Sequence, residues 1–269
     1  MLSLDEKFAL VLQTYAEAEE ELMTLGGNPP PNATASLHAM LNQAGPFAEQ
    51  TLFFGIGDDH LPLVLELNEP AAGAILTVGD SLSPQRRILR TMLHSAVREN
   101  RPHLVSLGII SPALNSFTDF NKLPHTVGMA YPYQREAEDL LYRACELTEA
   151  RRNGRQDTTP AFLLVCDDLC EYWQNLDNSA QRSLMWLMEH GSKNAVWTIF
   201  SLKAQQVRDI PWELLKLLPT RLLTRIERPQ TAAIFAGGDL PLVQQIDPEL
   251  QFVTALGETW FTFNLPEDV

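Results

Sequence analysis

The sequence predicts an α/β fold with a mostly parallel sheet and helices on both faces. Short apolar runs of strand length alternate along the chain with longer segments whose apolar residues recur every three or four positions. The segments between successive apolar runs are long enough to hold a helix. A strand, helix, strand order with such crossover connections is typical of parallel strands.

The individual elements follow from these patterns. Strands are expected over Leu61–Leu67, Gly73–Val78, His103–Ile110, Ala161–Cys166 and Ala195–Phe200. Helices are expected over Arg86–Val97, residues 135–152 and Ser179–His190, because each of these segments has an apolar face. Each expected helix lies between two expected strands, which places the helices on the faces of the sheet.

A separate amphipathic helix is expected at the amino terminus. Its apolar residues recur at spacings of four and three, at Leu4, Phe8, Val11, Tyr15, Ala18 and Leu22. Two glycines and three prolines then end the pattern. This helix either packs on its own domain or is offered to a partner. We therefore divide the chain into the helix at 1–26, a proline-containing linker with a short helix at 27–50, and the main domain at 51–269.

Composition limits the class of protein. The chain has 269 residues and is 45% apolar, which suits one large buried core. No stretch approaches the roughly 18 apolar residues of a membrane span, and the start of the chain lacks the basic flank of a signal peptide. We expect a cytoplasmic protein without membrane association. The three cysteines form no CxxC and the six histidines no HxxxH or HxH spacing, so no metal site is expected.

The net charge of −14 argues against nucleic acid as the main partner, because DNA binding depends on neutralising phosphates. The charge is uneven, however. Residues 1–26 hold six acids and one lysine, and residues 239–269 hold six acids and no base, which leaves the middle near −3. Two arginine clusters in the middle are either DNA contacts or a solvated surface: Arg86, Arg87, Arg90, Arg98 and Arg101, then Arg151, Arg152 and Arg155.

Two strand ends have the layout of a nucleotide site. Residues 74–87 form an apolar strand, a loop that starts with a glycine, and a helix. Residues 162–169 form an apolar strand that ends in the carboxylates Asp167 and Asp168. Ligands of parallel α/β sheets bind at the carboxyl ends of strands. The two junctions are therefore candidates for a phosphate loop and a magnesium-holding strand.

From about Leu52 to about Leu265 the chain resembles the motor domain of FtsK/SpoIIIE ATPases, whose relatives include HerA and the type VII secretion motors. The matching segments occur in the family's order at Leu52–Leu67, Leu123–Thr126, Glu136–Arg152, Pro219–Arg221 and Gly237–Gly238. They are similar to the segment before the phosphate loop, the "IPHL" turn and its helix, and the "PTR" and "GG" elements. The resemblance implies a RecA-like P-loop NTPase fold.

The phosphate loop departs from the pattern GxxxxGK[ST]. The aligned residues are Gly79, Asp80, Ser81, Leu82, Ser83, Pro84, Gln85 and Arg86. Pro84 lacks the N–H and the freedom of a glycine. Gln85 replaces the lysine that contacts the β and γ phosphates, and Arg86 replaces the hydroxyl that ligates magnesium. Asp80 adds a carboxylate that repels phosphate. These changes predict a degenerate Walker A motif.

The other two parts of the site also differ from the family. Asp167 stands at the magnesium-side position of a degenerate Walker B motif, and Asp168 replaces the glutamate that polarises the attacking water. Leu202 aligns with a glutamine that the family uses to sense the γ phosphate. We hypothesise that Arg86 or Arg87 pairs with Asp167 or Asp168 in the vacated magnesium position. The alternative is that both arginines simply face solvent.

The resemblance with these losses implies a catalytically inactive pseudo-ATPase that acts as a scaffold or regulatory partner. Motor domains of the family form rings in which a neighbour's arginine completes each site. A protein partner is therefore expected, either a homo-oligomer or an active FtsK/HerA-like motor, and Arg221 is either such an arginine or a structural residue. No cofactor is expected. One alternative is an active or ATP-binding DNA translocase that uses ATP and magnesium at a non-standard site. Another is a different anion bound near Arg86 and Arg87.

Overall fold

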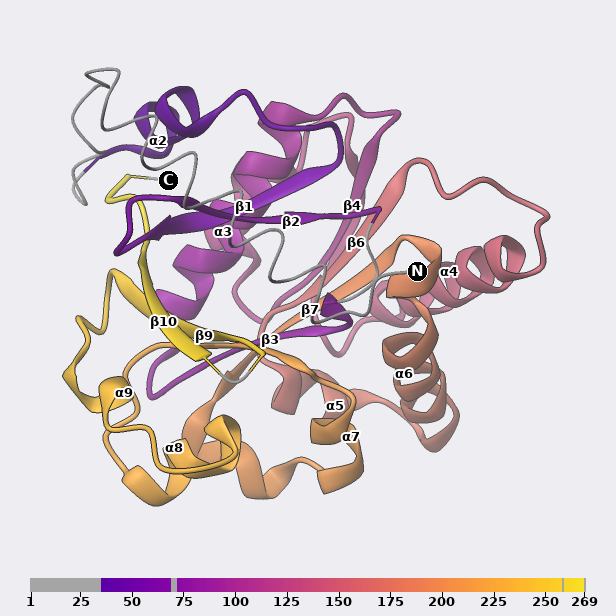
Figure 1. Ribbon diagram of the computed structural model, residues 1–269. Coiled ribbons are helices and arrows are strands. Elements are labelled where there is room, and N and C mark those ends of the chain that lie inside the picture. The colour runs from indigo at the N-terminus through magenta and orange to yellow at the C-terminus, as the bar shows by residue number, and fades with distance from the viewer. Residues whose placement is uncertain (1–34, 69–71, 258, 269) are drawn as a thin grey trace, which may run out of the picture. The chain divides into compact units, whose positions relative to one another are not determined.

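The structure is a computed structural model that describes residues 35–68, 72–257 and 259–268 (Figure 1). The helix expected within residues 1–26 lies outside these ranges, as does the start of the expected linker. The short helix expected in that linker is α2, Leu37–Ala44. Its Met40 and Leu41 lie in one hydrophobic cluster with Phe53 and Ile56 of the first strand, so α2 packs directly on the sheet.

A single ten-stranded sheet forms the centre of the described residues, in the order β2-β1-β10-β9-β8-β3-β7-β6-β4-β5. The strands are β1 Thr51–Gly57, β2 Pro62–Glu66, β3 Ile75–Gly79, β4 Val105–Ile110, β5 Thr126–Ala130, β6 Ala161–Cys166, β7 Val196–Lys203, β8 Thr220–Leu223, β9 Gln251–Leu256 and β10 Thr259–Asn264. The strands from β8 to β5 pair in parallel. The remaining strands extend this parallel part by antiparallel pairs.

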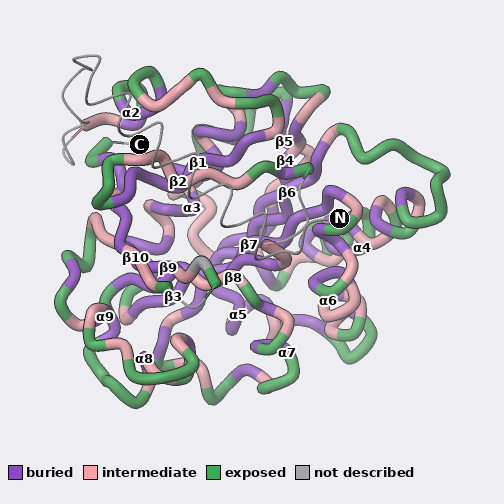
Figure 2. Tube along the Cα trace, in the orientation of Figure 1, coloured by how far each residue is buried: buried purple, intermediate pink, exposed green. Residues whose placement is uncertain are grey.

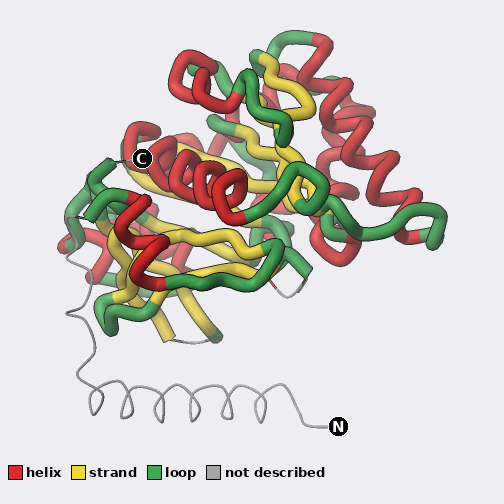
Figure 3. The backbone as a smooth tube through the Cα atoms, turned by 90° about the horizontal axis from the view of Figure 1, so that it is seen from above, coloured by secondary structure: helices red, strands yellow, loops and turns green. Residues whose placement is uncertain are grey.

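Helices cover both faces of the parallel strands (Figure 3). The α-helices after α2 are α3 Leu82–Glu99, α4 Arg135–Arg152, α5 Leu169–Asn175, α6 Asn178–His190, α7 Trp212–Lys216, α8 Pro229–Ala236 and α9 Leu242–Gln245. The 3-10 helices are η2 Leu114–Phe120, η3 Ser192–Asn194 and η4 Ala204–Asp209. Side chains alternate along each strand, so the two faces of the sheet contribute to two separate cores.

The two cores are seen best at β6, which is buried along its whole length (Figure 2). Leu163 lies in the core that contains Leu89 of α3. Its neighbour Phe162 lies in the opposite core, with Leu141 of α4 and Leu184 of α6. A strand buried on both faces has a continuous apolar sequence, and this is why the segment from Ala161 to Cys166 shows no alternation.

The predicted fold class is confirmed, since the sheet is mostly parallel and has helices on both faces. The expected helix at 135–152 and strand at 161–166 have the observed bounds. The expected helix at Arg86–Val97 is wrong at its start, because α3 begins at Leu82. Ser81 caps the helix by accepting a hydrogen bond from the Ser83 N–H at 3.3 Å. Pro84 fits in the first turn, where an N–H has no helical acceptor.

Candidate functional site

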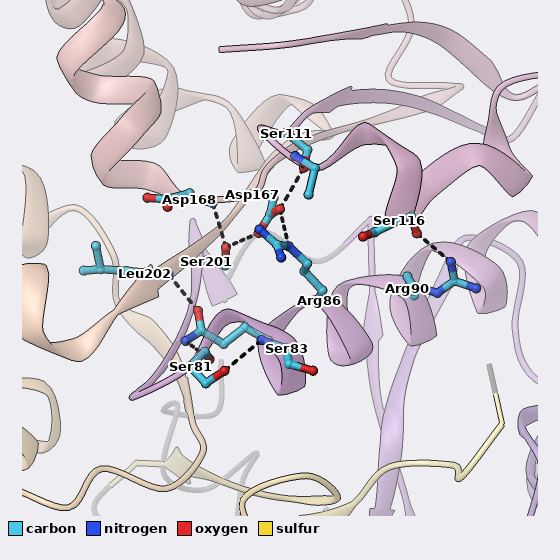
Figure 4. A network of polar contacts seen from close by, with 12 residues as sticks. Ser81, Ser83, Arg86, Arg90, Ser111, Ser116, Asp167, Asp168, Ser201 and Leu202 are labelled. Atoms are coloured by element: carbon cyan, nitrogen blue, oxygen red, sulfur yellow. Dashed lines mark hydrogen bonds and ion pairs between the residues drawn. The ribbon is translucent and has the colours of Figure 1, made fainter.

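The two strand-end junctions of the sequence lie together at the carboxyl ends of the central strands (Figure 4). β7 lies between β3 and β6 and pairs in parallel with both. The carboxyl ends of these three strands therefore meet, with the turn after Gly79, the carboxylates after Cys166 and Leu202 of β7 as neighbours. The structure brings together all three segments that the sequence connected with a nucleotide site.

The turn between β3 and α3 is very short. Only Asp80 and Ser81 separate the end of β3 from the first residue of α3. Leu82 and Pro84 are buried in the first turn of the helix. Of the eight positions aligned with a phosphate loop, the last five, from Leu82 to Arg86, are therefore helical.

Gln85 is fully buried at 0% exposure and links the turn to β7. Its Nε2 donates to the carbonyl oxygens of Gly79 at 3.2 Å and Ser81 at 2.8 Å. Its Oε1 accepts the backbone N–H of Leu202 at 2.9 Å. Both N–H donors of the amide are used inside the protein, and a buried amide with all donors paired avoids the cost of desolvation. The Leu202 side chain itself is fully buried in the core beside β3.

Gly79 and Asp80 have structural contacts of their own. A Cβ at Gly79 would lie 2.2 Å from Cγ2 of Thr224, the residue that follows β8, so the Thr224 side chain leaves room only for a glycine here. The Asp80 carboxylate accepts hydrogen bonds from Gln205 Nε2 and from the Glu227 N–H, both at 2.8 Å.

A shallow pocket beside this turn carries three carboxylates and one guanidinium. Its lining residues are Asp80, Ser81, Pro84, Thr224, Arg225, Glu227, Pro248 and Glu249. The excess of negative charge makes the pocket unfavourable for a polyanion such as a triphosphate.

The carboxylate of Asp167 is fully buried and accepts three hydrogen bonds. Arg86 Nε and Ser111 Oγ donate to Oδ2, each at 2.7 Å, and Ser201 Oγ donates to Oδ1 at 2.8 Å. The hypothesis that Arg86 pairs with Asp167 is confirmed, and Figure 4 shows the guanidinium against this carboxylate. Ser111 and Ser201 are not among the residues expected at this site from the sequence. Their signal was available, because each is a hydroxyl residue at or near the carboxyl end of a strand adjacent to β6.

Among the described residues, no arginine forms an ion pair with Asp168. It lies in the left-handed region with φ 63° and caps α5, where its Oδ1 accepts the Glu171 N–H at 3.2 Å. Its own N–H donates to Ser201 Oγ at 2.8 Å. The pKa of Glu171 is raised, first by burial and then by the nearby carboxylates of Asp168 and Asp167. This edge of the sheet is therefore rich in negative charge, which Arg86 partly balances.

The arginines of both clusters mostly contact their own chain. Arg87 Nη2 donates to the Glu267 carbonyl oxygen at 2.8 Å, and Arg90 pairs with Asp119 at 2.7 Å. Arg151 is buried and donates to the carbonyl oxygens of Asn194 and Ala195, each at 3.0 Å, and its pKa falls to about 10 because of burial. Arg151 is thus a buried structural residue, whereas Arg87 and Arg90 are half-buried and bind their own chain from the helix surface.

Arg221 has a structural role. It donates hydrogen bonds to four carbonyl oxygens near the ends of α7 and α8, those of Leu215, Leu218, Ile234 and Phe235. A cation at a helix carboxyl end is favoured by the helix dipole and by the unpaired carbonyls there. Burial lowers the pKa of this guanidinium. The N–H groups of Arg221 donate to its own chain, as expected of a structural residue. An arginine that completes a neighbour's site would instead direct these groups away from its own chain.

Within the described ranges, no cluster of three or more histidine, cysteine or acidic side chains is arranged to hold a metal ion. No helix there has the length and apolar character needed to cross a bilayer.

The architecture matches that of P-loop ATPase domains. No protein-family model and no curated protein matches the sequence. Among solved structures, EssC (ATPases 2 and 3) from Geobacillus thermodenitrificans has a TM-score of 0.71 at 14% identity, covering 90% of this chain and 49% of that one. The cytoplasmic domain of the type VII secretion ATPase EccC from Thermomonospora curvata has a TM-score of 0.70 at 16% identity, covering 87% and 32%.

A third similar structure is the pCW3 conjugation coupling protein TcpA, in monomer form with ATPγS. Its TM-score is 0.67 at 14% identity, covering 88% of this chain and 70% of that one. The chain thus has the fold of ATPase domains from secretion and conjugation proteins. It spans only 32% to 55% of the length of the EccC and EssC chains that it matches.

We expect Gln85→Lys to lower the free energy of unfolding by about 3 kcal/mol. A lysine has no oxygen to accept the hydrogen bond from the Leu202 N–H. Its ammonium group would also be buried without a carboxylate to balance its charge. Urea denaturation measures the change. Gln205→Lys is the matched control, because Gln205 is exposed and a lysine there still reaches Asp80. Equal stability of the two variants would contradict the role assigned to Gln85.

We expect Gly79→Ala to destabilise the protein by about 2 kcal/mol, because the new methyl group overlaps Cγ2 of Thr224. Adding Thr224→Ser removes that methyl but retains the hydroxyl that donates to the Pro248 carbonyl oxygen. The double variant should therefore recover most of the loss in thermal denaturation. Additive destabilisation by the two substitutions would show that the contact is not the cause.

Proposed function

We propose that the chain is a pseudo-ATPase of the FtsK/HerA type that acts as a scaffold or regulatory partner of a DNA-translocase or secretion-type motor. The observation that carries the proposal is the early start of α3. A phosphate loop holds its ligand with successive backbone N–H groups of a flexible turn. Here most of the corresponding residues form a helical turn, and Pro84 has no N–H to offer.

The side chains that would act on a nucleotide are also engaged elsewhere. Gln85 brings no positive charge and binds backbone groups of β3, the turn and β7. Asp168 caps α5, and the Leu202 side chain is buried in the core. The site therefore has neither a lysine for the phosphates nor a free carboxylate to polarise water.

The residues present do not fit a magnesium ion held with ATP. The loop hydroxyl that would ligate magnesium is replaced by Arg86, whose guanidinium brings a positive charge against Asp167. A divalent cation beside that guanidinium would be repelled. We accordingly expect no nucleotide or metal cofactor, and both Walker motifs are interpreted as degenerate.

A protein is the expected partner. The net charge of −14 and the internal contacts of Arg86, Arg87 and Arg90 leave little positive surface for a phosphate backbone. The fold is shared with ATPase domains that occur in tandem in EssC and EccC. A domain of this fold without a working site can still occupy a position in such an assembly. We propose a cytoplasmic homo-oligomer or a complex with an active motor of the family.

Isothermal titration calorimetry with magnesium and ATP should detect no binding at millimolar nucleotide, and phosphate release should not exceed the buffer rate, because the turn offers no phosphate cradle. The TcpA coupling protein, whose structure contains ATPγS, provides a positive control for binding. Micromolar binding with turnover would instead establish the alternative, an active translocase with a non-standard site.

The regulatory role is tested with an intact FtsK/HerA-type motor encoded in the same genome. Adding the chain should form a complex in light scattering and change the ATP hydrolysis rate of the motor at least about twofold, a shift of about 0.4 kcal/mol in activation free energy. A monomeric chain that neither binds such a motor nor self-associates would exclude both partner models.

A further inference from the structure

We propose that the guanidinium of Arg86 is a resident counter-ion that replaces a divalent cation at Asp167, and that Asp167, Ser111 and Ser201 form a latent divalent-cation site when this guanidinium is removed. The inference deepens the proposed function and rests on it for its biological meaning. Its physical basis is separate, because it depends on the surroundings of Asp167 and not on the shape of the β3–α3 turn.

The charge of Asp167 needs a partner inside the protein. Asp167 has 0% exposure, and a buried carboxylate is stable as an ion only with a counter-charge or several donors. The ion pair described for Asp167 is the one with Arg86. Asp168 is also buried directly beside it in the sequence, so the local excess of negative charge makes a cation more necessary.

Two hydroxyl oxygens lie beside the charge of Asp167. Ser111 follows β4 and Ser201 lies in β7, and both hydroxyls lie within 2.8 Å of the Asp167 carboxylate, which follows β6. Carboxylate, hydroxyl and water oxygens are the ligands preferred by magnesium and manganese. The Arg86 Nε lies 2.7 Å from Oδ2 and so contacts directly a carboxylate oxygen that would ligate a cation.

Arg86 is held in place by helix α3. Its Cα belongs to the second turn of α3, and the residue before it, Gln85, is locked to the Leu202 N–H. The counter-ion is thus part of the chain and cannot dissociate as a metal ion does. The ends of β3, β4, β6 and β7 are linked without any ligand, so the protein should present one arrangement to a partner whether or not magnesium and ATP are present.

Arg86→Ala provides the test, with Mn²⁺ alone as the probe. We expect its melting temperature to fall by roughly 10 °C, because a buried carboxylate loses its partner. Millimolar Mn²⁺ should restore at least about half of that loss. Electron paramagnetic resonance should show bound Mn²⁺ in Arg86→Ala and none in the wild type. Adding Asp167→Asn to Arg86→Ala should abolish both the resonance signal and the thermal shift.

Arg87→Ala is the matched control, since it removes the same charge from the next position of α3, where the side chain binds the Glu267 carbonyl oxygen. It should bind no Mn²⁺. If Arg86→Ala does not fold in metal-free buffer, its recovery on refolding with Mn²⁺ becomes the measurement. The inference is overturned if Arg86→Ala gains no Mn²⁺ response in either assay, or if the wild type binds Mn²⁺ equally well. A wild type that binds ATP contradicts the proposed function instead.

Discussion

The buried carboxylate of Asp167 is the constraint on which the candidate site depends. It lies at the end of a strand that is buried on both faces, where water cannot balance its charge. Arg86, Ser111 and Ser201 reach it from three other elements. Each of these contacts also links two segments of the sheet edge, so balancing one charge holds the ends of β4, β6 and β7 against the first turns of α3.

The neighbouring Gln85 completes this arrangement with uncharged hydrogen bonds. In an active P-loop protein the phosphates and their metal connect the loop, the acidic strand end and the sensor strand. Here two consecutive side chains of α3 make connections between the same segments, Gln85 to β7 and Arg86 to Asp167. Side chains of the protein itself therefore hold the carboxyl ends of these strands together.

Several of the described arginines bind groups of their own chain. Arginines that are close together in the sequence bind different partners: the Asp119 carboxylate for Arg90, the Glu267 carbonyl oxygen for Arg87, and the Asn194 carbonyl oxygen for Arg151. Arg221 likewise binds the ends of two helices. These residues stabilise the fold, and the described surface keeps an acidic pocket beside the short turn.

Local patterns in the sequence determined the parallel α/β class and the exact bounds of α4 and β6. These features follow from periodicity and from the order of strand ends, which neighbouring residues reveal. The alignment with the family's motifs left an ion pair open between Arg86 or Arg87 and Asp167 or Asp168, and the tertiary structure selected Arg86 and Asp167. Only the tertiary structure decided the start of α3 at Leu82, the contact of Gln85 with Leu202, the hydroxyls of Ser111 and Ser201, and the antiparallel edge from β9 to β2. Such features depend on partners far apart in the chain, 117 residues in the case of Gln85, and no local pattern specifies which distant backbone group a buried amide will meet.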